Sequence, residues 1–371
     1  MTTAVFLPLV SPTLMCPPAP LAPSSGVDPV SPRQYLDVVR ARIDERLREI
    51  FAQVEGDTTA AAPATLPVLA AARDLTMRGG KRLRPAMLFA AIECVEPGAH
   101  PRATTDVGAA LELFQTYLLI HDDWMDNDPV RRGAPSVHVS LARHYGDAHL
   151  GACSAILAGD LLSALVHELV GSVELPAARR RALVQAFGRM EREVILGQCL
   201  DVTHNQDIQR IHDLKTGSYT VRGPLLLGAA IAGAPEEVWR AFERFAEPLG
   251  LAFQLRDDVL GAFGSEADTG KPVGGDFREG KSTLLVRHAL EHLDASDRDE
   301  LRAVLGRRDA SEADVLRAQA LVERSGAREH AESVVRALRE RCLAALDTPA
   351  LLPDGRRLLA GFAAMLSERS K

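Results

Sequence analysis

Apolar residues recur every three to four positions in one segment after another from Arg33 onward. This spacing places them on one face of an α-helix, because a helix has about 3.6 residues per turn. The alternation of period two that marks a half-buried strand is nowhere sustained. The helical segments expected from this pattern are residues 33–54, 82–95, 104–127, 149–172, 177–201, 236–260, 281–293, 312–323, 326–347 and 355–367.

Composition favours the same fold class. Aromatic residues make up only 5% of the 371 residues, and alanine and leucine are abundant, which suits packing of helix on helix. The 46% apolar content is ample for a buried core. We therefore predict an all-α protein. Residues 1–32 are rich in proline without apolar periodicity and are expected to form a disordered tail, with residues 33–371 as a single helical domain.

The charge balance narrows the class of partner. The chain has 43 basic and 50 acidic residues and a net charge of −7, which argues against nucleic acid or an anionic membrane as the main partner. An anionic ligand would need a local basic cluster.

Three further features favour a cytoplasmic protein. The five cysteines are scattered and form no C-x-x-C pair, which is typical of a reducing compartment. No apolar run is expected to reach the length of a membrane span. No lysine or arginine precedes Arg33, so the charged start of a signal peptide is missing.

The segment LIHDDWMDNDPVRRG, residues 119–133, contains four aspartates within seven positions, and two arginines follow them. In a helix over residues 104–127, Asp122 and Asp126 lie one turn apart on one face, and Gln115 lies on that face two turns earlier. An acidic helix end exposed to water is the simpler interpretation. However, the carboxylates repel one another, lie where the helix macrodipole disfavours negative charge, and follow a strongly apolar approach. Together these penalties favour a bound cation.

A hard divalent ion such as Mg²⁺ fits this pattern. It takes oxygen ligands and is often held by one or two carboxylates together with the phosphates of a substrate. Arg131 and Arg132 supply guanidinium groups for the same phosphates. The segment therefore indicates a site for a magnesium-bound diphosphate.

A second carboxylate pair, Asp257 and Asp258, follows another apolar helical segment, LAFQLRDDVLG. Gln254 precedes Asp257 by three positions and is expected on the same face. One such pair on a helix is most simply a solvated surface, but two pairs that each follow apolar turns support each other as parts of one site. We expect Asp122 and Asp257 to converge across a cavity.

Lysine is rare in this chain, with five residues against 38 arginines. Lys81, Lys215, Lys271 and Lys281 all lie near glycines, where the backbone can approach a phosphate closely, and the fifth is the C-terminal Lys371. A compact ammonium group differs from a guanidinium as a phosphate partner, so we interpret the four as phosphate-binding residues, with chance retention as the alternative.

Two other motifs lack the context that they require. Residues 275–282 match the phosphate-binding loop G-x-x-x-x-G-K-[ST], but no buried strand precedes them, and Asp276 and Glu279 would repel phosphate. A zinc or HD-type hydrolase centre at His121 and Asp122 lacks a second spaced histidine or cysteine pair. We expect His121 to hydrogen-bond a neighbouring helix, and His138 and His144 to be structural.

With these residues in place, the chain resembles the trans-type (E)-polyprenyl diphosphate synthase family, in its short-chain, farnesyl- and geranylgeranyl-forming branch. The resemblance runs from about residue 35 to the end. It implies the isoprenoid synthase fold, with antiparallel helices around a central active-site cavity. The segments that carry it, in the family's order, are GGKRLRP, LIHDDWMDNDPVRRG, LAGDLL, GQCLD, KTGSYT, LAFQLRDDVLG and TGKPVGGDFREGKSTLL.

The resemblance assigns roles to individual residues. Its DDxxD motif matches Asp122, Asp123 and Asp126, so Asp128 is an extra carboxylate. Asp122 and Asp126 would bind two Mg²⁺ ions and Asp257 a third. The residues implied to hold the allylic diphosphate are Arg131, Lys215 and Lys271, and those for isopentenyl diphosphate are Lys81, Arg84, Gln115 and Arg132. The residues implied to support the ions and leaving group are Asp123, Gln198, Asp201, Thr216, Gln254, Asp258 and Lys281.

This chain departs from the family pattern at two positions. Gly261 replaces the third aspartate of the second motif, and we expect activity to survive because water can complete an octahedral shell. Gln115 stands where the family often has histidine, and both side chains can donate a hydrogen bond to phosphate.

The resemblance implies head-to-tail condensation of an allylic diphosphate with isopentenyl diphosphate, and it suggests a homodimer. Tyr117 and Leu118 occupy the family's chain-length positions. A tyrosine there resembles a floor that favours a C15 or C20 product, although an interhelical core aromatic is an equally good interpretation. Two alternatives share the fold: a class I terpene cyclase, whose second motif we do not find, and a catalytically silent partner subunit.

Overall fold

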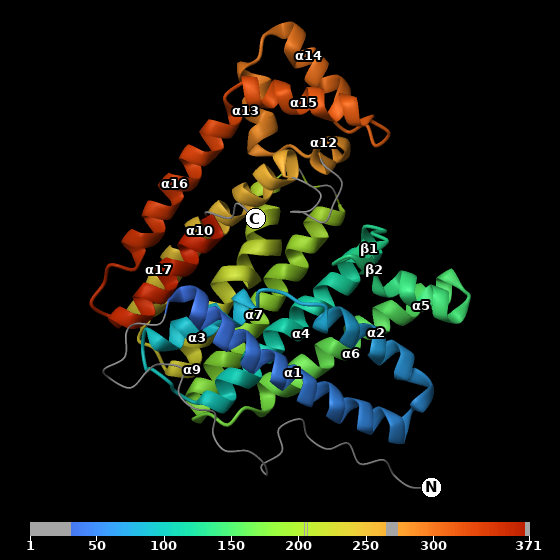
Figure 1. Ribbon diagram of the computed structural model, residues 1–371. Coiled ribbons are helices and arrows are strands. Elements are labelled where there is room, and N and C mark those ends of the chain that lie inside the picture. The colour runs from blue at the N-terminus through green and yellow to red at the C-terminus, as the bar shows by residue number, and fades with distance from the viewer. Residues whose placement is uncertain (1–30, 204, 206, 265–273, 368–371) are drawn as a thin grey trace. The chain divides into compact units, whose positions relative to one another are not determined.

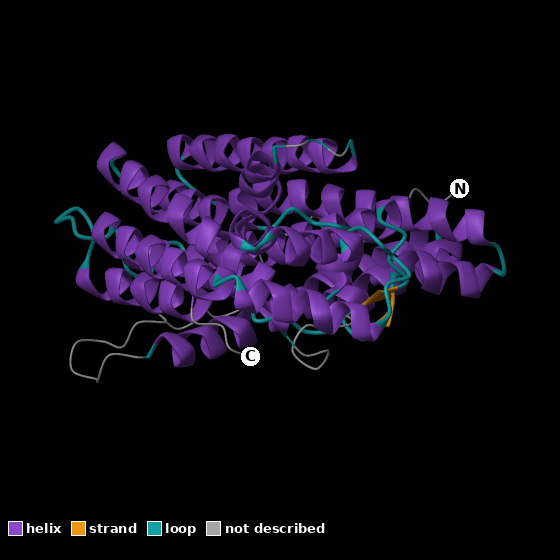
Figure 2. Ribbon diagram, turned by 90° about the horizontal axis from the view of Figure 1, so that it is seen from above, coloured by secondary structure: helices purple, strands orange, loops and turns teal. Residues whose placement is uncertain are grey.

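The computed structural model describes residues 31–203, 205, 207–264 and 274–367 (Figure 1). Nearly all of this part is helical, as Figure 2 shows in purple. Its strands are β1 (Val130–Arg131) and β2 (Ala134–Pro135), which pair antiparallel with Val130 opposite Pro135. The prediction of an all-α fold is confirmed.

The chain forms two compact units, and each contains three separate chain segments. The first consists of the described parts of Met1–Arg192, Tyr219–Arg240 and Pro349–Leu359. The second consists of those of Glu193–Ser218, Ala241–Thr348 and Ala360–Lys371. That residues 33–371 act as one domain stays a prediction.

The first unit is organised around helix α4 (Pro101–Met125), which packs against six neighbouring helices. Fifteen of its residues are buried, so the apolar stretch before the first aspartates is core. The neighbours are α1 (Pro32–Ala61), α2 (Leu66–Met77), α3 (Leu83–Glu93), α5 (Val137–Tyr145), α6 (Ala148–Ser172) and α9 (Gly223–Ala232). A short 3₁₀ turn, η1 (Pro63–Thr65), links α1 to α2.

The second unit has its own apolar core, to which α10 (Glu236–Phe263) contributes Val259 and Ala262. Helices α13 and α16 pack against each other, as do α14 and α15. Its other helices are α8 (Ile208–His212), α12 (Gly275–Glu279), α13 (Leu284–His292), α14 (Ala295–Val304), α15 (Glu312–Arg324) and α16 (Ala327–Ala345). Helices α7 (Ala177–Val202), η2 (Asp213–Arg222), α10 and α17 (Pro353–Ser367) contribute residues to both units.

Local sequence signals account for several helix starts. Helix α1 begins at Pro32, directly after Ser31, which forms a capping box with Gln34. The predicted boundary between the N-terminal tail and the helical domain, after residue 32, therefore lies one residue inside this helix. Helix α15 begins with the same device at Ser311 and Asp314.

The apolar period predicted ten helices but missed several others. All ten residues of α9 are buried, so this helix is apolar all round and shows no one-sided period. Helix α14 is polar and short, with two buried residues. The other missed segments are α2, α5, α8, η2 and α12.

One expectation about membranes needs correction. Among the described residues, α6 is long and apolar enough to cross a membrane, with a mean hydropathy of 1.6 over its most apolar window. The alanines, leucines and valines raise this average, while glycine, serine, histidine, Asp160 and Glu168 interrupt the apolar run. In the first unit α6 packs against α2, α4 and α5.

Candidate active site

The first aspartate cluster lies at the end of α4. Asp122 and Asp123 are in the last helical turn, and Asp126 is the C-cap residue, whose amide donates to the carbonyl oxygen of Asp122 at 2.9 Å. The expected one-turn separation of Asp122 and Asp126 is therefore present. The negative charge lies at the end of the helix where the macrodipole disfavours it.

Asp123 is the buried member of this cluster. Its side chain is fully buried, and burial raises the pKa of its carboxyl group to about 6, against the opposing effect of Arg131. Among the described residues, its Oδ2 atom is buried and has no hydrogen-bond partner. This oxygen of Asp123 could therefore take part in one further polar contact.

Arg131 faces three carboxylates at once. Its Nε donates to Oδ1 of Asp123 at 2.6 Å, and its Nη2 lies 3.3 Å from Asp128 and 3.9 Å from Asp122. Asp128, which the family motif leaves out, therefore helps to orient this arginine. The guanidinium predicted to hold an allylic diphosphate is engaged by the acidic cluster, so a diphosphate would have to share it.

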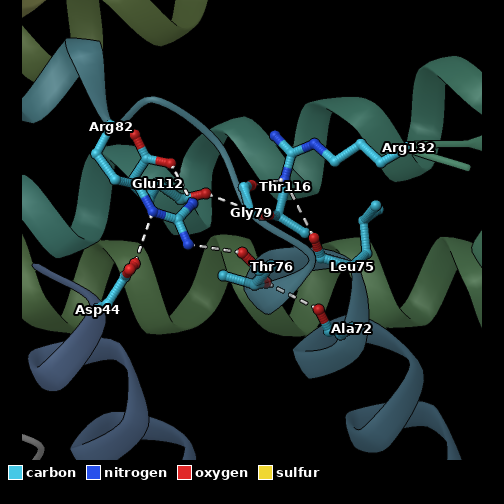
Figure 3. A network of polar contacts seen from close by, with 9 residues as sticks. All are labelled: Asp44, Ala72, Leu75, Thr76, Gly79, Arg82, Glu112, Thr116 and Arg132. Carbon is cyan, nitrogen blue, oxygen red and sulfur yellow. Dashed lines mark hydrogen bonds and ion pairs between the residues drawn. The ribbon is translucent and has the colours of Figure 1, made fainter. Parts of the chain in front are cut away.

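Arg82 organises the glycine-rich loop before α3, as Figure 3 shows. It has φ of 51° and donates to Glu112 at 2.7 Å, to Asp44 at 2.8 Å and to the carbonyl oxygen of Thr76 at 3.0 Å. Arg82 and Glu112 are both buried. The loop that carries Lys81, directly before α3 with Arg84, is thus fixed by a buried ion pair.

Arg132, which is predicted to bind phosphate, also contacts this loop. Its Nη1 donates to the carbonyl oxygens of Gly79 at 2.6 Å and Leu75 at 3.2 Å (Figure 3). Burial lowers the pKa of its guanidinium group, and the neighbouring cations Arg82, Arg84 and Arg131 lower it further. This crowding of positive charge suits an anionic ligand, although two donor contacts of Arg132 go to backbone.

Arg84 lies in the first turn of helix α3 and contacts the start of the second chain segment of the first unit. Its Nη2 donates to Oγ1 of Thr220 at 2.9 Å, and its Cζ lies 4.3 Å from the centre of the Tyr219 ring. Its Nε is buried without a hydrogen-bond partner among the described residues. An unpaired buried donor is a reason to expect a further acceptor here.

In the second unit, Lys215 lies in η2, a stretch of π-helix. Its Nζ donates to Oδ2 of Asp201 at 2.5 Å. A Cβ built on Gly197 of α7 would overlap the amide nitrogen of Lys215 and lie 2.8 Å from its Cα. The glycine before Gln198 therefore allows η2 to lie directly against α7 and places Lys215 beside Asp201.

The second aspartate pair lies on α10. Asp258 is buried, and burial raises the pKa of its carboxyl group to about 6, with further increases from the carboxylates of Asp276 and Asp257. The Nε2 of Gln254 donates to Oδ1 of Asp258 at 3.0 Å. Gln254 thus supports Asp258, one helical turn further along α10.

Lys281 pairs with Asp276, at 2.9 Å between Nζ and Oδ1, and with Glu279 at 2.8 Å. Although partial burial opposes the charged form, these carboxylates raise the pKa of Lys281. The ammonium predicted to contact phosphate is thus charged. Asp276, which sequence reasoning treated only as an objection to a nucleotide loop, is its partner.

The remaining predicted residues are placed as follows. Gln115, Tyr117 and Leu118 are half-buried on α4, and the Tyr117 ring centre is 5.7 Å from that of Phe114 and 4.9 Å from that of His121. Lys81 is exposed. Gln198 on α7 and Thr216 on η2 are half-buried. Lys271 lies outside the described residues.

The structure agrees with a structural role for His121 and His138, and it gives residues 275–282 no nucleotide-binding context. Nε2 of His121 is 3.1 Å from the carbonyl oxygen of Ile156 on α6, as expected for a link between helices. His138 lies 3.2 Å from Oγ of Ser136. The apparent nucleotide loop begins with the short helix α12, and no described strand adjoins it.

The donor set suits Mg²⁺. Carboxylate oxygens are the ligands that this ion prefers, and one oxygen of Asp123 is buried and unpaired. In the part of the chain that the structure describes, no three acidic, histidine or cysteine side chains are grouped closely enough to hold an ion alone. This fits an ion held by one or two carboxylates together with substrate phosphates.

Comparisons with known proteins agree with this site. The family model described as polyprenyl synthetase matches residues 67–322. A short chain isoprenyl diphosphate synthase of Methanothermobacter thermautotrophicus is 34% identical over 350 residues, covering 91% of this chain and 99% of the relative. A geranylfarnesyl diphosphate synthase of Aeropyrum pernix is 34% identical and covers 80% of this chain and 92% of the relative.

A solved structure extends the similarity to three dimensions. The crystal structure of geranylgeranyl pyrophosphate synthase from Corynebacterium glutamicum, complexed with isoprenyl diphosphate and magnesium, matches with a TM-score of 0.80 and 32% identity. The match covers 92% of this chain and 100% of the Corynebacterium glutamicum chain. Helical architecture and site together thus define a transferase of isoprenoid biosynthesis with the isoprenoid synthase fold. The chain belongs to the polyprenyl synthetase family, as its sequence motifs predict.

Proposed function

We propose that this protein condenses isopentenyl diphosphate with an allylic diphosphate, which gives a short-chain trans-prenyl diphosphate and pyrophosphate. The observation that carries the proposal is the paired set of acidic and basic residues in each unit. Asp123 with Arg131 forms one set, and Asp276 with Lys281 lies beside the second aspartate pair. The relatives named short chain isoprenyl and geranylgeranyl synthases support a product of C15 to C20, with geranylgeranyl diphosphate favoured. The geranylfarnesyl relative is named for a product one isoprene unit longer.

The reaction begins when the allylic C–O bond breaks. Its electron pair moves to the diphosphate, and the carbon is left as an allylic cation. Lys215 and Arg131, and Lys271 outside the described residues, would stabilise the growing charge on the leaving group. The double bond of isopentenyl diphosphate then attacks the cation, and pyrophosphate accepts the proton that is lost. Water must be excluded, because it would trap the cation as an alcohol.

We propose that the enzyme depends on Mg²⁺, with three ions in the substrate complex. Asp122 and Asp126 would hold two of them and Asp257 the third, with Asp123, Asp201 and Asp258 in support. When bound, Mg²⁺ would neutralise charge on the diphosphates. Lys81, Arg84, Gln115 and Arg132 would hold isopentenyl diphosphate. The buried Nε of Arg84, which is unpaired among the described residues, supports this assignment.

Tyr117 is proposed to limit product length. It lies one turn and a half before the first aspartates and packs against Phe114, whose ring centre is 5.3 Å from that of Phe187 on α7. These aromatic side chains form a bulky group below the acidic residues along α4. Tyr117→Ala is expected to add at least one isoprene unit to the main product, measured by chromatography of the dephosphorylated alcohols. Tyr145→Ala on α5 is the matched control, and an unchanged product length in the Tyr117 variant would remove this residue from the gauge.

The test of the function is an elongation assay. Purified protein is incubated with Mg²⁺, isopentenyl diphosphate and dimethylallyl, geranyl or farnesyl diphosphate, and the products are sized after dephosphorylation. Linear elongated products are expected. Absence of elongation with every primer would overturn the proposal in favour of a silent partner subunit, and cyclic hydrocarbons would indicate a terpene cyclase.

We propose that the enzyme is a homodimer in the cytoplasm. Leu150 and Leu157, seven residues apart on α6, are 46% and 62% exposed. In the second unit, Ile195 and Val202, also seven residues apart on α7, are 44% and 50% exposed. Exposed apolar residues on α6 and α7 are a reason to expect a protein partner, and we propose that this partner is a second copy of the chain. The four described cysteines carry free thiols, which fits a reducing compartment.

A further inference from the structure

The hairpin of β1 and β2 carries Arg131 and Arg132, and it is very short. Each strand has two residues, and Arg132 and Gly133 between them have φ of 52° and 73°. Positive φ at both central residues is the geometry of a tight two-residue turn. Because a two-stranded hairpin is marginally stable at best on its own in water, contacts from the rest of the first unit must fix it.

Arg78 makes such a contact from the C-cap position of α2. Its Nη1 donates to the carbonyl oxygen of Pro135 at 2.9 Å and to that of Arg131 at 3.3 Å. Arg131 is in β1 and Pro135 is in β2, so the two N–H groups of this one nitrogen join both strands to α2. The side chain of Arg78 is 15% exposed, so these bonds are largely shielded from water.

Asp74 orients the other half of the same guanidinium group. Its Oδ2 accepts a hydrogen bond from Nε of Arg78 at 2.8 Å and another from Nη2. Nε and Nη2 therefore face the carboxylate, while Nη1 faces the hairpin. A planar guanidinium with donors in fixed directions can satisfy all of these acceptors at once.

Arg132 forms the connection in the reverse direction. Its Nη1 donates to the carbonyl oxygens of Leu75, in the last turn of α2, and Gly79, in the glycine-rich loop (Figure 3). One arginine thus passes from α2 to the backbone of the hairpin, and the other passes from the hairpin to the backbone beside Arg78. The two elements are braced from both sides.

We propose that Arg78 is a positioning residue that locks the β1–β2 hairpin to the glycine-rich loop, so that Arg131, Arg132 and Lys81 meet the substrates as one preorganised group. The inference rests on the proposed function, because these three residues are assigned there to the two diphosphates. Arg78 acts through the hairpin backbone and Asp74, and it is not itself a phosphate contact in this proposal.

The brace should matter more for one substrate than for the other. Lys81 and Arg132, both assigned to isopentenyl diphosphate, lie on the two elements that Arg78 joins. The allylic diphosphate is assigned to Arg131 on the hairpin but also to Lys215, which belongs to the second unit. Loss of Arg78 should therefore weaken the binding of isopentenyl diphosphate most.

The first experiment measures steady-state elongation by the full-length protein with each substrate varied in turn. Arg78→Ala is expected to raise KM for isopentenyl diphosphate about tenfold or more, with smaller changes in kcat and in KM for the allylic primer. Arg73→Ala is the matched control, because Arg73 lies on the same helix, is 44% exposed and pairs with Glu55. A lower kcat with both KM values unchanged would indicate only a loss of folded enzyme, and it would overturn the proposal.

The second experiment separates positioning from charge. Asp74→Asn leaves the charge of Arg78 in place and removes a negative charge, so electrostatics alone would strengthen the binding of an anionic substrate. Loss of the carboxylate that orients Arg78 should instead raise KM for isopentenyl diphosphate, by a smaller factor than Arg78→Ala. A KM equal to or below that of the wild type would overturn the proposal.

Hydrogen exchange tests the brace without substrate. In Arg78→Ala the backbone amides of residues 129–136 are expected to exchange several-fold faster, while those of α6 keep their wild-type rates. Wild-type exchange in the hairpin would overturn the proposal. If the wild-type protein elongates no primer, the proposed function fails and the inference fails with it. If the wild type elongates and Arg78→Ala keeps both KM values, the inference alone is wrong.

Discussion

At the scale of single residues, Arg82 shows how the loop beneath the proposed diphosphate site is held. Its side chain is 2% exposed, and it pairs with Glu112, which is 3% exposed. A buried ion pair adds little net stability over apolar residues, but removal of one partner leaves the other charge buried and uncompensated. The pair therefore makes the conformation of the loop depend on both residues.

Glu112→Gln is expected to lower the free energy of unfolding by about 3 kcal/mol, because Arg82 would keep only Asp44 as a charged partner. Denaturant unfolding measures this change. The exposed pair of Arg73 and Glu55 provides the control, and Glu55→Gln should cost no more than about 1 kcal/mol. Equal effects of the two variants would show that burial of the Arg82 pair has no energetic consequence.

At the scale of elements, glycines decide how closely helices approach. Gly197 and Gly188 both lie on α7, but a Cβ at position 197 would overlap the backbone of η2, whereas one at position 188 meets nothing within 4 Å. The same substitution in one helix should therefore have opposite effects at these two positions.

Gly197→Ala is expected to lower the free energy of unfolding by about 1–3 kcal/mol through overpacking and to weaken pyrophosphate binding. Gly188→Ala should raise it by about 0.5–1 kcal/mol, because alanine loses less backbone entropy in a helix. A double-mutant cycle with Lys215→Ala tests the link to function. If Gly197 acts by placing Lys215, Gly197→Ala will have little further effect on binding once Lys215 is absent.

Helices α13 and α16 carry a pH-sensitive contact outside the proposed site. The ring centre of His288 is 3.9 Å from that of His292 and 4.5 Å from that of His330, and the rings are nearly parallel. Partial burial lowers the pKa of His288, and the two neighbouring imidazoles lower it further, against the opposing effect of Glu291. The folded state therefore favours the neutral ring.

This shift makes stability fall in acid. A histidine whose pKa is lower in the folded state than its unfolded value of about 6.5 binds its proton more tightly when unfolded, so stability is lost as pH falls through that range. His288→Gln should reduce the difference in unfolding midpoint between pH 7.5 and pH 5. His149→Gln on α6, outside the cluster, serves as control, and an unchanged pH dependence in the His288 variant would contradict the prediction.

At the scale of the whole molecule, the exposed leucines of α6 predict association. Leu157 is 62% exposed in the single chain, and Leu157→Glu places a charge where the side chain would be desolvated between two copies. The variant is expected to shift the protein from dimer to monomer in analytical ultracentrifugation, with little change in the stability of the chain itself. Leu316→Glu is the control, since Leu316 on α15 is 58% exposed without a matching apolar face. A wild-type protein that is monomeric at micromolar concentration would exclude the dimer.

The sequence by itself determined the fold class, the family and most of the long helices. Apolar period, helix caps and the spacing of Asp122 from Asp126 are local features, so they can be read from neighbouring residues alone. Helix α9 was not predicted, because a helix that is buried all round has no one-sided apolar period.

The tertiary structure alone decided which distant residues meet. Arg82 with Glu112, Gly197 with Lys215 and Gly261 with Asp276 are each separated by 15 residues or more, and no local pattern specifies such contacts. Arg132, which is predicted to bind phosphate, also donates from Nη1 to the backbone of Gly79 and Leu75, because the folded loop brings those carbonyl groups within reach. Residue types and spacing thus set the available chemistry, while packing determined the partner of each charged group.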